Sequence, residues 1–121
     1  MNLIIAGCRD FNDYELLSRE VKSFAGPFLS RVTVVSGHAK GADKLGEKFA
    51  QENGLPLIIK PADWAAYGKA AGPKRNEEMA RISSALVAFW DGQSRGTKNM
   101  IELARKHGLR VKVVRFDKNV G

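Results

Sequence analysis

Apolar runs of strand length alternate along this chain with segments that have the apolar spacing of a helix. The five runs that we expect to form strands span about residues 3–6, 31–35, 56–60, 85–90 and 109–115. The segments between them carry apolar residues three and four positions apart, which predicts helices over about 13–24, over 42–52, from Pro73 onward and over 97–106. This alternation is typical of an α/β protein in which a parallel sheet has helices on both faces.

The expected strands can be ordered, because chains of this kind usually adopt the order 3-2-1-4-5. The last run alternates apolar and basic residues over 109–113, which predicts an edge strand with one less covered face. The connection over 62–72 is unusually long, and two interpretations stay open. It is either a functional loop, in which Trp64 and Tyr67 stack on a base, or a short extra helix that covers a sheet edge. With 121 residues, the chain is expected to form a single domain over 1–121.

Two glycine-rich turns follow expected strands and lead into expected helices. They cover residues 36–43 and 91–97. A turn of this kind presents backbone N–H groups at the positive end of the helix dipole, where a phosphate is well held. Neither turn matches the dinucleotide fingerprint G-x-G-x-x-G or the P-loop. Each turn alone fits an ordinary connection between a strand and a helix, but the presence of both favours a nucleotide-type ligand.

The ligand crevice of an open parallel sheet lies beyond the carboxyl ends of the strands, where the strand order reverses. The two turns and the loop after residue 6 should therefore converge between the first and fourth strands. The candidate ligand-binding residues in these loops are Gly7, Arg9, Asp10, Ser36, Gly37, Gly41, Ala42, Asp43, Gly92, Ser94, Gly96 and Thr97. Backbone N–H groups and hydroxyls suit phosphate oxygens, and a carboxylate such as Asp43 or Asp91 suits sugar hydroxyls.

Composition and charge narrow the classes of partner. The formal charge of +7 attracts polyanions, but the basic residues are dispersed over the chain without a consecutive block. Their one local concentration coincides with the expected edge strand and comprises Arg105, Lys106, Arg110, Lys112, Arg115 and Lys118. The single cysteine, Cys8, excludes an internal disulfide and offers no metal-ligand spacing. No apolar stretch reaches the roughly 20 residues of a membrane span, so we expect a cytoplasmic protein without a metal, a resident cofactor or a membrane partner.

Five ordered motifs carry a resemblance to a known family. They lie at residues 7–10, 36–43, 62–64, 72–79 and 91–97. Together they resemble the YspA/cpYpsA-related branch of the SLOG superfamily, whose Rossmann-like domains include the Lonely-Guy phosphoribohydrolases and the DNA-processing protein DprA. The resemblance implies recognition of a nucleotide or a nucleotide-derived small molecule. It also implies that the phosphate lies on the loop over 92–97, that residues 36–43 make neighbouring contacts, and that two copies could pair as a homodimer.

The resemblance is weaker for catalysis. Lonely-Guy enzymes carry a Pro-Gly-Gly-x-Gly-Thr-x-x-Glu motif with a catalytic glutamate, and in this chain Gly96-Thr97 is followed by Met100 at the glutamate position. Arg75, followed by Asn76 in the expected helix after Pro73, could take the part of the family's arginine and bind phosphate. If the chain is a hydrolase, the carboxylates to consider are Asp10, Asp43 and Asp91, although each of them fits a turn or capping role better.

Three functions therefore stay open. The one that we favour is binding of a nucleotide-type small molecule for sensing or sequestration. The second is hydrolysis of a nucleoside monophosphate, with Arg75 and Asp91 as the tentative catalytic residues. The third is single-stranded nucleic-acid binding in the manner of DprA, which the dispersed charge makes less favourable.

Overall fold

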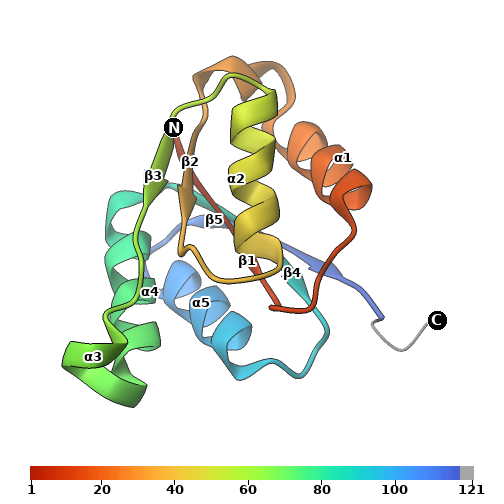
Figure 1. Ribbon diagram of the computed structural model, residues 1–121. Coiled ribbons are helices and arrows are strands. Elements are labelled where there is room, and N and C mark those ends of the chain that lie inside the picture. The colour runs from red at the N-terminus through yellow and green to blue at the C-terminus, as the bar shows by residue number, and fades with distance from the viewer. Residues whose placement is uncertain (118–121) are drawn as a thin grey trace.

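Five parallel strands form one sheet in a computed structural model that describes residues 1–117 (Figure 1). The strands are β1 Asn2–Gly7, β2 Thr33–Ser36, β3 Leu57–Ile59, β4 Ala85–Trp90 and β5 Arg110–Arg115, and their order is β3-β2-β1-β4-β5. The α-helices are α1 Tyr14–Ala25, α2 Ala42–Glu52, α3 Trp64–Tyr67, α4 Ala71–Ile82 and α5 Arg95–Lys106, with the 3-10 helices η1 Gly26–Arg31 and η2 Gly68–Ala70. The predicted α/β class and strand order are confirmed. Lys118, the last residue of the predicted basic concentration, lies outside the described residues.

Two apolar layers hold the sheet between the helices. Successive residues of β1, such as Ile4 and Ile5, point to opposite faces of the sheet because side chains alternate along a strand. Helices α1 and α2 cover the face of Ile5, where Phe49 is fully buried. Helices α4 and α5 cover the face of Ile4, where Met79 and Met100 are buried. The strands β1 and β4 are thus covered on both sides, which explains their continuous apolar sequences.

The two edges of the sheet differ from its centre. Strands β3 and β5 lie at the edges, and none of the β5 residues is fully buried. Arg110 places its guanidinium over the Phe24 ring, and Lys112 pairs with Glu20 at 2.7 Å. The prediction of an edge strand is therefore confirmed, and part of the C-terminal basic concentration is paired with neighbouring helices.

Local capping sets the element bounds that differ from the prediction. The connection over 62–72 contains α3, whose N-cap is Asp63, followed by η2 and the start of α4 at Ala71. The segment thus contains a short extra helix, as one interpretation expected, but the main contacts of this helix are with η2 and α4, and its Trp64 lines the cavity described below. Helix α5 begins at Arg95, two residues before the predicted start, because Ser94 caps it. The 3-10 helix η1 was not predicted from the apolar spacing.

Candidate functional site

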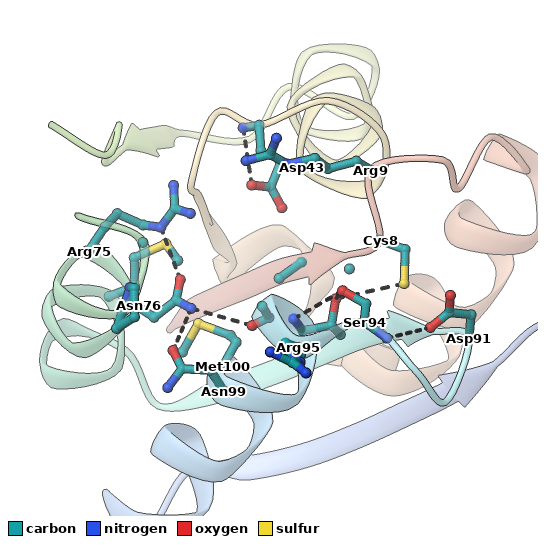
Figure 2. Close-up of a pocket in the computed structure, with 18 of the residues that line it drawn as sticks. Cys8, Arg9, Asp43, Arg75, Asn76, Asp91, Ser94, Arg95, Asn99 and Met100 are labelled. Carbon is teal, nitrogen blue, oxygen red and sulfur yellow. Dashed lines mark hydrogen bonds between the residues drawn. The ribbon is translucent and has the colours of Figure 1, made fainter. Parts of the chain in front are cut away.

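A cavity of about 980 Å³ opens at the carboxyl ends of β1 and β4, where the strand order reverses. It is bounded by the loops after these strands, by Trp64 of α3, and by the first turns of α4 and α5. Figure 2 shows the side chains that the two loops, α4 and α5 place around it. The sequence-predicted residues that line it are Gly7, Arg9, Asp10, Asp43, Arg75, Asn76, Asp91, Ser94, Gly96 and Thr97. Its volume lies at the upper end of the usual range for small-molecule sites, about 300 to 1,000 Å³.

The turn between β4 and α5 forms one wall of the cavity. Asp91 Oδ1 accepts hydrogen bonds of 2.8 Å from the backbone N–H groups of Gln93 and Ser94, and this fixes the turn. Ser94 Oγ accepts from the Thr97 N–H at 3.5 Å and from the Thr97 hydroxyl at 3.3 Å. The first N–H groups of an α-helix have no partner within the helix, and Arg95 and Gly96, the first residues of α5, line the cavity. This wall therefore presents the positive end of the α5 dipole to the cavity.

Asp43 and two arginines form the facing wall. The Asp43 side chain is 5% exposed, and its Oδ2 accepts a hydrogen bond of 3.1 Å from the Ala39 N–H. Burial raises the pKa of Asp43 to about 6, although Arg75 and Arg9 act in the opposite direction. Burial likewise lowers the pKa of Arg75, and the charge of Asp43 partly offsets this. Figure 2 shows Asp43 beside Arg9, with Arg75 on the opposite side of the cavity from Asp91.

Arg75 is held by two hydrogen bonds that connect α4 to the loop after β2. Its Nη1 donates to the Gly37 carbonyl at 2.5 Å, and its Nε donates to Asn76 Oδ1 at 2.9 Å. Asn76, which is 6% exposed, in turn donates from Nδ2 to Asn99 Oδ1 at 2.9 Å. The guanidinium is thus positioned at the cavity by fixed groups, as a binding site for an anion requires.

Five predicted ligand-binding residues do not line the cavity, and they are Ser36, Gly37, Gly41, Ala42 and Gly92. The Ser36 side chain is fully buried and donates from Oγ to Glu47 Oε2 at 2.8 Å, so its hydroxyl supports the loop. Glu47 also lies 2.9 Å from His38 Nδ1, which fixes the turn at a residue with a φ of 63°. Glu47 is not among the candidate residues that the sequence indicates. The signal for it is its place four residues after Asp43, on the same buried face of α2.

The small residues of the first two loops permit close backbone packing. The Ala42 N–H donates to the Cys8 carbonyl at 3.3 Å. A Cβ at Gly41, whose φ is 77°, would collide with the backbone carbonyls of Cys8 and Arg9. A Cβ at Gly7 would lie 2.8 Å from the Ala42 Cβ. Gly41 and Ala42 therefore shape the cavity from behind its surface.

Several lining residues were not among the candidate ligand-binding residues of the sequence. Met79, Met100 and Asn99 face the cavity from the helices below it, and Met100 is 2% exposed. The position that carries the Lonely-Guy glutamate thus contributes an apolar thioether to the cavity wall. Cys8 also lines the cavity, with its Sγ 3.7 Å from Thr97 Oγ1, and burial raises the pKa of its thiol. The sequence could have indicated Met100 as a cavity residue, because it lies three positions after Thr97 on the same face of a helix. No short motif in the sequence indicates Met79.

A family model matches the first half of the chain. It describes the YspA, cpYpsA-related SLOG family and matches residues 1–67, which include β1, the loop after β2 and α2. This chain belongs to that family. No curated protein matches it.

The fold is also similar to a solved structure. This is DNA processing protein A (DprA) from Streptococcus pneumoniae, with a TM-score of 0.72 and 18% sequence identity. The alignment covers 98% of this chain and 51% of the DprA chain, so the chain spans about half the length of that protein. At this identity the similarity supports the Rossmann-like α/β architecture.

Two further properties concern the described residues as a whole. Within residues 1–117 there is no helix with the length and apolar character needed to cross a membrane. Over the same range no group of three or more His, Cys, Asp or Glu side chains is arranged to hold a metal ion.

Proposed function

We propose that this protein binds a nucleotide or a nucleotide-derived small molecule in the cavity between β1 and β4. The observation that carries the proposal is one cavity with two suitable walls: the first residues of α5 on one side and the arginines Arg9 and Arg75 on the other. Helix N-terminal N–H groups and guanidinium groups are the protein groups best suited to phosphate oxygens. Membership of the SLOG family supports the same ligand class.

The acidic residues of the cavity fit the sugar of such a ligand. A carboxylate accepts hydrogen bonds from hydroxyl groups and repels phosphate oxygens, so its neighbours decide which end of the ligand it faces. Asp43 lies on the Arg75 side, and Asp10, which follows β1, also lines the cavity. We assign the ribose hydroxyls to this pair and the phosphate to the space between the loop over 92–97 and the guanidinium groups that face it. Binding without turnover, for sensing or sequestration, agrees with the apolar Met100 at the family's glutamate position.

Thermal shift measurements test this proposal. AMP, ADP, NAD⁺ and ADP-ribose at millimolar concentration should raise the Tm, because a ligand that binds only the folded state stabilises it by RT ln(1 + [L]/Kd). Arg75→Ala should weaken binding about 10- to 100-fold, since a hydrogen bond to a charged group is worth about 1.5 to 3 kcal/mol. Arg81→Ala is the matched control, because Arg81 lies on the same helix and is an exposed partner of Glu77. A panel that leaves the Tm unchanged contradicts the proposal.

A second candidate function is hydrolysis of the bond between base and ribose, and Asp43 favours it. A buried carboxyl group with a pKa near 6 can exchange a proton at neutral pH, as a general acid or base must. Water would add to the anomeric carbon while the base leaves with a proton, giving ribose 5-phosphate and free base. Chromatography of an AMP incubation tests this reaction. Base release that is lost in Asp43→Asn supports hydrolysis, and no release leaves binding as the function.

Nucleic-acid binding is the third candidate, and its support is the similarity of the fold to DprA, a DNA processing protein. The basic residues of β5 weaken this candidate, because Arg110 and Lys112 contact Phe24 and Glu20. Binding of a single-stranded oligonucleotide that falls steeply with salt would favour it over small-molecule binding.

A further inference from the structure

Trp64 is an exposed aromatic residue at the rim of the cavity. It begins the four-residue helix α3, lines the cavity, and is 51% exposed. Exposing half of a tryptophan leaves a large apolar area in water, because such a side chain can bury 150–250 Å². Trp64 belongs to neither apolar layer of the sheet, so packing against a sheet edge does not account for it.

The backbone around Trp64 holds the indole against the start of α4. Asp63 Oδ1 accepts a hydrogen bond of 3.1 Å from the Ala66 N–H and so caps α3. The neighbouring residue of α4 is Gly72, where an added Cβ would lie 3.4 Å from Trp64 Cη2. The absence of a side chain at Gly72 thus brings the ring close to the helix.

The walls of the cavity differ between its two ends. Figure 1 shows α3 beside the start of α4, away from the loop between β4 and α5. Trp64 contacts the start of α4 at Gly72, and Arg75 and Asn76 follow in the same helix, whereas the hydrogen-bonding groups of Ser94, Gly96 and Thr97 come from the start of α5. Asn99 also lines the cavity: its Oδ1 accepts from Asn76 Nδ2, and its own Nδ2 can donate to the edge of a base. An exposed indole and the N-terminal groups of α5 thus line the same cavity, and a nucleotide carries the matching pair of groups, an aromatic base and a phosphate.

We infer that Trp64 is a stacking platform for the base of the bound nucleotide and thus selects ligands that carry a base over sugar phosphates. The inference rests on the proposed function and adds the orientation of the ligand: base at α3, ribose near Asp10 and Asp43, and phosphate at α5. An indole face stacks on any nucleobase because each base has a π surface. Trp64 therefore favours the presence of a base, and the contacts at the base edge select among bases.

Calorimetric titration of three variants with AMP and with ribose 5-phosphate tests this assignment. Trp64→Ala should weaken AMP binding about 5- to 150-fold, the range found for loss of one base–aromatic stack, and change ribose 5-phosphate binding less than about twofold. Trp64→Phe should retain most of the AMP affinity. Tyr67→Ala is the matched control: Tyr67 lies on the same helix and is 49% exposed, but it does not line the cavity, so its loss should leave both affinities unchanged.

The outcomes separate this inference from the proposed function. If wild-type protein and the Trp64→Ala variant bind AMP equally tightly, the inference that Trp64 stacks on the base is wrong, and the proposed nucleotide binding is unaffected. Equal weakening of AMP and ribose 5-phosphate in Trp64→Ala also overturns it, because Trp64 would then act on the whole cavity. If Tyr67→Ala weakens AMP binding as strongly as Trp64→Ala does, the effect belongs to helix α3 as a whole, and the inference about Trp64 is again overturned. Wild-type protein that binds neither compound contradicts the proposed function itself.

Discussion

Asp43 should make the stability of this protein depend on pH in the direction opposite to that of most carboxylates. Its pKa is 3.8 in the unfolded chain and about 6 in the folded protein, because burial disfavours the charged form. Between these values the folded protein binds more protons than the unfolded chain. The free energy of unfolding therefore rises as the pH falls from above 6 toward 3.8.

The magnitude follows from the two pKa values. At 1.36 kcal/mol per pKa unit, the ionised Asp43 costs about 3 kcal/mol of stability at pH above 6. Most of this cost disappears on acidification, so about 2 kcal/mol should be regained between pH 7.5 and pH 4.5. In a chain of this size, that corresponds to a rise in Tm of roughly 5 to 10 °C. The acidic partner Glu47 and the basic partners Arg75 and Arg9 are part of this balance.

Urea denaturation of wild-type and Asp43→Asn protein at several pH values measures this effect. Asparagine cannot ionise but can still accept the Ala39 N–H bond, so the difference in unfolding free energy between the two proteins should change by about 2 kcal/mol over this pH range. Asp63→Asn is the control, because asparagine also caps helices and Asp63 is exposed. Parallel pH profiles for wild type and Asp43→Asn would refute the reasoning. The reasoning would also be refuted if acidification raised the unfolding free energy of Asp43→Asn more than that of the wild type.

Two further predictions concern packing. Phe89→Ala should lower the unfolding free energy in urea by about 3 to 5 kcal/mol, because Phe89 is fully buried and stacks on Phe11 with ring centroids 4.7 Å apart; a loss below about 1 kcal/mol would contradict the packing. Gly41→Ala should cost more than Gly54→Ala in the same assay, because both have positive φ but only at Gly41 does a Cβ meet the carbonyls of Cys8 and Arg9. Equal losses of about 1 to 2 kcal/mol at both positions would indicate a purely conformational cost.

The fold was accessible from the sequence where burial is continuous. Strand β4 has its predicted bounds, 85–90, because both of its faces are covered and its apolar run has no polar interruption. Helix α2 also has its predicted bounds, because glycines stand at both of its ends. Local spacing did not predict η1, and it left α3 as one of two interpretations. Helices this short carry too few residues to show a period of 3.6.

The candidate site was accessible only in part. The loops after β1 and β4 were predicted to face each other, and Gly7, Arg9, Asp91 and Thr97 line one cavity. Ser36 was predicted on the same basis, but its hydroxyl donates to Glu47 within the fold. A loop sequence does not specify which way a hydroxyl points, because partners from distant elements decide it.

The sequence by itself determined the class of fold, the order of the strands and the segments that meet at the end of the sheet. These follow from apolar periodicity and from the few topologies open to alternating strands and helices. Tertiary structure alone decided what each side chain does at that end. It buried Asp43 and thereby raised its pKa, placed Met100 in the cavity wall and left Trp64 exposed at the rim. The reason is physical: burial and hydrogen bonding depend on residues that are distant in the chain, and their identity is fixed only once the sheet and its helices have packed.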